Sequence, residues 1–233
     1  MNLLTPNGHI VTRIADRNYI IDTGSPISFN YEGIPSLELG GQTFNFSRMA
    51  ACSRKGLIGL TGMDIAGLIG TDILAETGLT IDLEGKTLAF SADSDNIDSN
   101  EYVGLSFDYF LGKTMGRYLV TEDVFMGRQL RNAIIDTGAP VPYVSAGLTA
   151  LFEHTGELYE DFSPSYGILK GEYLRGELIL KHHPQQVSRS VKVGLMPELL
   201  DMFGLFDAIL GVTALSDKKI IFDFNKMKLF VKI

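Results

Sequence analysis

Two stretches decide the fold of this chain: residues 17–24, RNYIIDTG, and residues 131–138, RNAIIDTG. The second begins 114 positions after the first, and both place Asp-Thr-Gly directly after two isoleucines. Two copies of one acidic turn in matching contexts indicate a duplicated unit. They also predict a site at which two carboxylates, Asp22 and Asp136, meet.

A second landmark extends the repeat beyond these turns. Residues 68–70 (LIG) match residues 209–211 (ILG) at an offset of 141, which then holds without a gap through residues 79–90 and 220–231. Apolar residues alternate along these segments, and a period of two predicts half-buried strands. The second copy carries 27 more residues than the first between its landmarks, the difference between 141 and 114. The sequence therefore predicts an all-β protein of two homologous halves.

The expected organisation is a first lobe over residues 1–92, a polar linker over residues 93–103 and a second lobe over residues 104–233. The linker lacks the glycine and the distal glutamate of a calcium-binding loop. The Gly-Gly pair at positions 40 and 41 predicts a hairpin over residues 37–46. Short helices are expected over residues 71–78, 149–154 and 197–203.

Composition limits the classes of partner. The net charge of −8 argues against nucleic acid. No apolar run approaches the roughly 20 residues of a membrane span, and residues 1–19 lack the pattern of a secretory signal. Cys52 is the only cysteine, so we expect a reducing, cytoplasmic setting. The four histidines fit no metal-binding spacing, and no metal or cofactor is expected.

Each Asp-Thr-Gly turn suits a carboxylate that is held in a shared cleft. Glycine allows the backbone to turn sharply, and the threonine hydroxyl can form a hydrogen bond to the partner loop. Two carboxylates at hydrogen-bond distance share one proton and titrate as a pair. The ionised member can take a proton from water while the protonated member donates to a carbonyl oxygen. This pattern predicts hydrolysis by an activated water.

These residues resemble the pepsin-like and retropepsin-like aspartic proteases, and the resemblance covers nearly the whole chain. It implies a bilobal acid-protease fold, with two β-barrel-like lobes related by a pseudo-twofold axis and carrying short helices. It also implies an aspartic endopeptidase that acts on extended polypeptides and works as a monomer, with Asp22 and Asp136 as the catalytic pair. By the same resemblance the dyad is supported by Thr23, Gly24, Ser25, Thr137, Gly138 and Ala139, the last of which departs from the more usual serine.

Members of this family cover their cleft with a flap hairpin, which pepsins carry on the first lobe. Here only 48 residues separate Asp22 from Gly70, and the extra residues belong to the second lobe. Residues 162–173, FSPSYGILKGEY, resemble a flap hairpin there; its expected substrate-binding residues are Tyr166, Gly167, Gly171 and Tyr173. The alternative for this segment is an ordinary surface insertion. The alternative for the whole chain is a non-catalytic peptide-binding or scaffolding module of the same fold.

Overall fold

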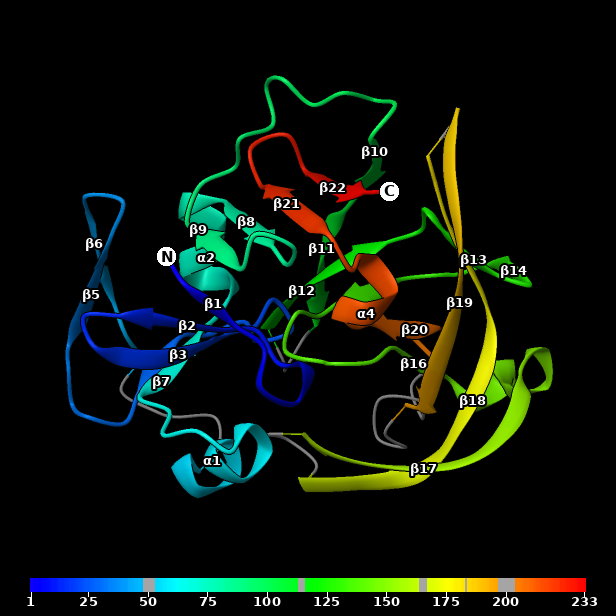
Figure 1. The fold of residues 1–233 in the computed structure, drawn as a ribbon, viewed down its shortest axis with the longest axis horizontal. Coiled ribbons are helices and arrows are strands. Elements are labelled where there is room, and N and C mark those ends of the chain that lie inside the picture. The colour runs from blue at the N-terminus through cyan, green and yellow to red at the C-terminus, as the bar shows by residue number, and fades with distance from the viewer. Residues whose placement is uncertain (48–52, 113–115, 164–166, 183, 197–203) are drawn as a thin grey trace.

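The computed structural model describes residues 1–47, 53–112, 116–163, 167–182, 184–196 and 204–233, whose regular structure is mostly β-strand with few short helices (Figure 1). The prediction of an all-β chain is confirmed. The helix expected over residues 197–203 lies outside the described residues. Within the described ranges, no helix has the length and apolar character needed to cross a bilayer.

In the first half, a five-stranded sheet carries the chain to Asp22. Its order is β1-β2-β3-β7-β4, and its strands are β1 (Leu3–Leu4), β2 (Val11–Ile14), β3 (Arg17–Ile21), β7 (Gly67–Ile69) and β4 (Phe29–Asn30). Strands β3 and β7 are parallel, and β4 runs antiparallel along the other side of β7. Because β3 ends at the buried Ile21, the aspartate follows directly at the end of a strand.

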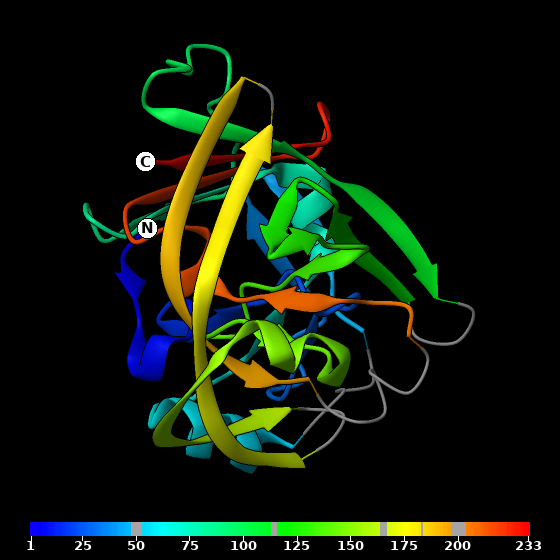
Figure 2. The ribbon, with the colours of Figure 1, turned by 90° about the vertical axis from the view of Figure 1, so that its right-hand side faces the viewer.

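The second half repeats this arrangement around Asp136. Strands β15 (Ala133–Ile135) and β20 (Ala208–Leu210) are parallel, and β16 (Tyr143–Val144) runs antiparallel to β20. The sheet continues in the order β11-β12-β15-β20-β16-β19-β18-β13-β14, with β17 paired to β18. Its other strands are β11 (Asp108–Gly112), β12 (Gly116–Thr121), β13 (Val124–Met126), β14 (Arg128–Gln129), β17 (Glu153–Ser163), β18 (Gly167–His182) and β19 (Gln185–Leu195). Figure 2 shows β18 and β19 as two long, curved neighbours.

A third sheet joins the two halves. Its order is β10-β22-β21-β8-β9, and its strands are β10 (Tyr102–Ser106), β22 (Lys228–Lys232), β21 (Lys219–Asp223), β8 (Leu79–Asp82) and β9 (Thr87–Ala89). At its centre β8 pairs with β21, and Thr80 faces Ile221, its own counterpart at the repeat offset. Exchanging the two copies therefore maps this ladder onto itself.

One apolar cluster runs through both halves beneath the aspartates. It includes the fully buried Ile21 and Ile69 of the first half and Ile135 and Leu210 of the second. The strands that end at the two aspartates thus pack into one continuous core. Such packing fixes the relative position of the loops that follow them.

Two local predictions are confirmed. Strands β5 (Ser36–Leu39) and β6 (Gln42–Asn45) form a hairpin whose turn residues, Gly40 and Gly41, have φ of +58° and +82°. Positive φ at both turn positions explains the Gly-Gly pair. Helix α2 (Thr71–Thr77) ends at Gly78, as its sequence predicts. Its N-cap is Gly70, while the side chain of Asp72 accepts hydrogen bonds from Ser28.

Other elements differ from expectation. In place of a helix over residues 149–154, the 3₁₀-helix η2 spans Ala146–Leu151, and Glu153 already pairs with Arg175 in the β17–β18 ladder. Cross-strand pairing here overrides local helix propensity. Helix α1 (Arg54–Thr61) was not expected, because Gly56 and Gly59 disfavour a helix. The remaining short elements are η1 (Pro6–Gly8) and α4 (Val212–Leu215). Strand β10 begins at residue 102, within the range expected to be linker.

Candidate active site

The two Asp-Thr-Gly loops meet and are joined by their threonines, both of which are fully buried. The backbone N–H of Thr23 donates to Oγ1 of Thr137 at 3.0 Å, and the N–H of Thr137 donates to Oγ1 of Thr23 at 3.0 Å. Each hydroxyl also donates across the contact, that of Thr23 to the Ile135 carbonyl and that of Thr137 to the Ile21 carbonyl, both at 2.9 Å. We call these four hydrogen bonds the threonine grip. Because these hydrogen bonds run in both directions between the two loops, they fix the separation of the loops.

The glycine of each loop lies against the carboxylate of the other. A Cβ added to Gly24 would lie 2.4 Å from Oδ2 of Asp136, and one added to Gly138 would lie 2.5 Å from Cγ of Asp22. Each glycine N–H also donates to Oδ1 of its own aspartate, at 2.8 Å in both loops. Any larger residue at either position would push the opposing carboxyl group away.

The two carboxyl groups form a hydrogen-bonded pair in which Asp22 is buried and Asp136 is half-buried. Burial, the charge of Asp136 and the hydrogen bond between the carboxyls hold the pKa of Asp22 well above its usual range. Burial also raises the pKa of Asp136, although hydrogen bonds from Asp22, Gly138 and Ala139 oppose this effect. The pair therefore retains a proton that isolated carboxyls would lose.

The outer residues of the two loops differ. The hydroxyl of Ser25 donates to the Ile27 carbonyl at 2.9 Å. Ala139 has no hydroxyl, and its backbone N–H donates to Oδ1 of Asp136 at 3.2 Å. The backbone N–H of Ser25 likewise lowers the pKa of Asp22, so the outer residues differ in the Ser25 hydroxyl, which is directed to Ile27.

The second landmark of each repeat supports the loop from beneath. A Cβ on Gly70 would lie 2.6 Å from the Ser25 carbonyl oxygen, and one on Gly211 would lie 2.4 Å from the Val141 carbonyl oxygen. The strand before each glycine also binds its aspartate, since the N–H groups of Asp22 and Asp136 donate at 3.0 and 3.1 Å to the last residues of β7 and β20. The recurrence of this glycine in both halves thus has a steric cause.

A cleft of about 860 Å³ opens beside the dyad. Its lining includes residues of η1 and α1 from the first half and residues of β17 and β18 from the second. Helix α1 and strand β17 lie at the bottom of Figure 1. Among the described residues that line it, neither aspartate occurs; the cleft meets the second loop at Pro140 and Val141. Its lining comprises Asn7, Gly8, His9, Ser53, Lys55, Gly56, Gly59, Leu60, Pro140, Val141, Tyr143, Glu160, Asp161, Ile168, Tyr173 and Thr213.

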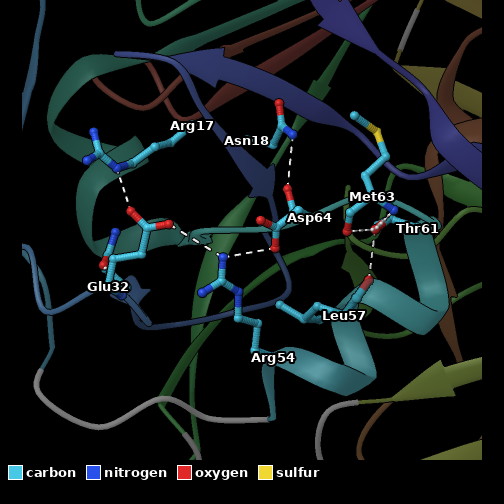
Figure 3. A network of polar contacts seen from close by, with 9 residues as sticks. Arg17, Asn18, Glu32, Arg54, Leu57, Thr61, Met63 and Asp64 are labelled. Atoms are coloured by element: carbon cyan, nitrogen blue, oxygen red, sulfur yellow. Dashed lines mark hydrogen bonds and ion pairs between the residues drawn. The ribbon is translucent and has the colours of Figure 1, made fainter.

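Helix α1 is tied to the first half by the ion pairs shown in Figure 3. Arg54 contacts Asp64 at 2.8 Å and Glu32 at 3.4 Å, and Glu32 also binds Arg17 of β3. The Ser53 hydroxyl caps the helix by accepting from the Gly56 N–H at 3.1 Å. These contacts hold in place the face of α1 that forms a wall of the cleft.

A buried tyrosine and a carboxylate stand on the opposite wall. The hydroxyl of Tyr143 donates to Asp161, and both residues line the cleft. Burial and the charge of Asp161 raise the pKa of Tyr143, so the phenol remains protonated. The charge of Asp161 also raises the pKa of Asp136 to a smaller extent. Sequence reasoning missed this pair, because nothing in the sequence connects two residues on different strands of the second half.

The expected flap segment is a hairpin. Ser163 pairs with Gly167 in the β17–β18 ladder, and Tyr166 lies outside the described residues. Gly171 faces Tyr159, whose ring would lie 2.8 Å from an added Cβ. Tyr173 is half-buried, lines the cleft and packs against Tyr159 with ring centroids 5.1 Å apart. The hairpin thus forms one wall of the cleft, and its action as a flap stays a prediction.

Comparison with models of known protein families and with curated proteins gives no match for this chain. Among the described residues, no three His, Cys, Asp or Glu side chains cluster in a way that could hold a metal ion.

The sequence-predicted residues Asp22, Thr23, Gly24 and their second-loop counterparts are brought together. The structure also adds His9, whose ring contacts the second loop and for which the sequence carries no signal.

Proposed function

We propose that this chain is an aspartic endopeptidase with a bilobal, pepsin-like fold, in which the two halves face each other across the dyad. One observation carries the proposal: two carboxyls, each at the end of an equivalent strand, share a hydrogen bond and are held by the threonine grip. A structural role alone does not account for two acidic groups placed in contact, because their mutual repulsion costs stability.

The proposed reaction needs only the dyad and a water. Asp136 is ionised and takes a proton from a water bound between the carboxyls, and the resulting hydroxide attacks the carbonyl carbon of a peptide bond. Asp22 donates its proton to the carbonyl oxygen, which gives a neutral tetrahedral diol. Asp136 then returns its proton to the amide nitrogen, the C–N bond breaks, and Asp22 recovers a proton from the diol. Each proton transfer of this kind typically contributes about 10²- to 10⁴-fold in rate.

The cleft supports an extended peptide as the substrate. It runs between α1 and the β17–β18 hairpin, and among the strands that the structure describes β17 pairs with β18 alone, so its other edge can add a strand. An added strand gains affinity from main-chain hydrogen bonds and selectivity from alternate side chains. Both aspartates belong to one chain, so the proposal needs no second subunit.

One observation favours the second candidate, a peptide-binding module that does not cleave. Neither aspartate is among the described residues that line the cleft, and Asp22 is only 8% exposed. A bound peptide therefore has to pass the second loop to reach the dyad. If it does not reach the dyad, the cleft binds the peptide but the peptide bond is not cleaved.

A peptide library digested over a range of pH separates the two candidates. We expect cleavage by the wild type and its loss in both Asp22→Asn and Asp136→Asn, with Asp16→Asn as the matched control because that carboxylate is 95% exposed and does not line the cleft. Tight binding of a statine-type inhibitor, which mimics the tetrahedral intermediate, provides an independent readout. Peptide binding without cleavage at any pH, or cleavage that survives both dyad substitutions, would reject the peptidase.

A further inference from the structure

His9 connects the first half of the chain to the second aspartate loop. The residue is only 2% exposed, and its Nδ1 lies 2.8 Å from the carbonyl oxygen of Gly138. A carbonyl oxygen can only accept, so Nδ1 must carry the proton and donate it. The ring therefore fixes the orientation of the Gly138 carbonyl.

This carbonyl belongs to the same planar peptide unit as the N–H of Ala139. That N–H donates to Oδ1 of Asp136 at 3.2 Å, alongside the N–H of Gly138 at 2.8 Å. A hydrogen bond accepted by the oxygen of a peptide polarises the unit and makes its N–H a better donor. A chain of hydrogen bonds thus leads from the imidazole of His9 to the carboxylate of Asp136.

The backbone that carries His9 is held by the first aspartate loop and packs on the second. The carbonyl of Ile10 accepts from the N–H of Ile21, the residue before Asp22, at 2.9 Å. Gly8 has a φ of +86°, and a Cβ added there would lie 2.8 Å from Cβ of Pro140. The imidazole is therefore fixed relative to both carboxyls of the dyad.

The duplication does not dictate this contact. The pairing of β2 with β3 and of β12 with β15 places the counterpart of His9 at Tyr118. The ring of Tyr118 packs edge-on against Phe206 with centroids 5.8 Å apart. The imidazole is thus a feature of one half, and it distinguishes Asp136 from Asp22.

We propose that His9 is a positioning residue of the dyad: by donating to the Gly138–Ala139 peptide it strengthens the hydrogen bonding of Asp136, which makes Asp136 the ionised member and leaves the proton on Asp22. This inference rests on the proposed function. Hydrogen bonds from Gly138 and Ala139 lower the pKa of Asp136, as those from Gly24 and Ser25 lower the pKa of Asp22, so the contact of His9 is what distinguishes the second loop. Asp22 and Asp161 also act on the pKa of Asp136. The other charged or titratable groups lining the neighbouring cleft, among the described residues, are Glu160, Tyr143, Tyr173 and Lys55.

The test compares three substitutions of His9. His9→Asn keeps a donor near the place of Nδ1, whereas His9→Phe keeps a ring without a donor. His9→Gln carries the same amide as asparagine but places it one carbon farther from the backbone. The carboxyl carbons of the aspartates are followed by ¹³C NMR as a function of pH, and the pH profiles of kcat and KM are measured on a cleaved peptide.

We expect His9→Phe to bring the two macroscopic pKa values of the dyad closer together by about half a pH unit, because only part of one hydrogen bond is transmitted through the peptide. This corresponds to roughly a threefold fall in kcat with little change in KM. His9→Asn should restore the wild-type separation, and His9→Gln should behave like His9→Phe. If His9→Phe does not fold, the asparagine and glutamine variants decide the question between them.

An unchanged separation of the two pKa values in both His9→Phe and His9→Gln would overturn the proposal, even if thermal stability falls, because a purely structural role predicts that result. A separation that His9→Asn fails to restore would also count against it. The NMR titration needs no substrate. If the wild type cleaves no peptide, the proposed function fails while the titration still decides the role of His9.

Discussion

The threonine grip offers the sharpest test of how the two halves are joined. Replacing Thr23 by valine keeps the size and the β-branching of the side chain but removes its hydroxyl. The N–H of Thr137 then loses its acceptor, and the carbonyl of Ile135 loses a donor. Both groups lie in a fully buried contact that water does not reach.

The expected cost follows from these two losses. An orphaned buried N–H costs about 1–3 kcal/mol, and the loss of one hydrogen bond at a carbonyl costs a further ~0.5–1.5 kcal/mol. We therefore expect Thr23→Val to lower the free energy of unfolding by about 2–4 kcal/mol. Thr137→Val should cost the same amount, because its hydrogen bonds have equal lengths, 3.0 and 2.9 Å. The double variant should approach the limit of stability, since domains are stabilised by only about 5–15 kcal/mol.

Urea unfolding followed by circular dichroism and tyrosine fluorescence measures these differences; the chain has no tryptophan. Thr12→Val is the matched control. That threonine is also fully buried, but its hydroxyl donates only to the carbonyl of the exposed Asn2, so the change should cost about 1 kcal/mol or less. The reasoning is refuted if Thr23→Val stays within about 0.5 kcal/mol of the wild type, or if the two grip variants differ by more than about 2 kcal/mol.

Two further predictions concern the dyad and its supports. Burial and Asp136 raise the pKa of Asp22 in the folded protein above its value in the unfolded chain. The folded state therefore binds this proton more tightly than the unfolded state does. The free energy of unfolding should then decrease as the pH rises from the unfolded-state pKa to the folded-state pKa. Asp22→Asn should reduce this dependence of stability on pH and should be more stable than the wild type at neutral pH. Thermal melts over pH 3–8 measure this, and an equal change of melting temperature with pH in the two proteins would contradict it. Gly70→Ala and Gly211→Ala should each destabilise by more than about 2 kcal/mol, because the added Cβ meets backbone oxygens at 2.6 and 2.4 Å. Gly59 lies in helix α1 with open space around it, so Gly59→Ala should instead stabilise the fold by about 0.5–1 kcal/mol. Similar melting temperatures for these three glycine variants would contradict the steric explanation.

The sequence by itself determined the features that depend on local pattern. Alternating apolar residues specify strands, the Gly-Gly pair specifies a hairpin, and Gly78 ends α2. The repeat of residues 17–24 at 131–138 was sufficient to place two equivalent loops opposite each other, because homologous strands end at homologous points of their sheets. Local pattern was less informative at the start of β17, where strand pairing overrode helix propensity. It also failed to predict α1, because the glycines in that segment disfavour a helix.

Only the tertiary structure decided which side chains surround the dyad. His9 and Gly138 lie 129 residues apart, and Tyr143 meets Asp161 across strands that are not neighbours in the sheet. Such contacts depend on sheet register, on the curvature of long strands and on how helix α1 packs, none of which leaves a periodic trace in the sequence. The duplication makes the two aspartates equivalent, and it is packing between different segments that makes them unequal.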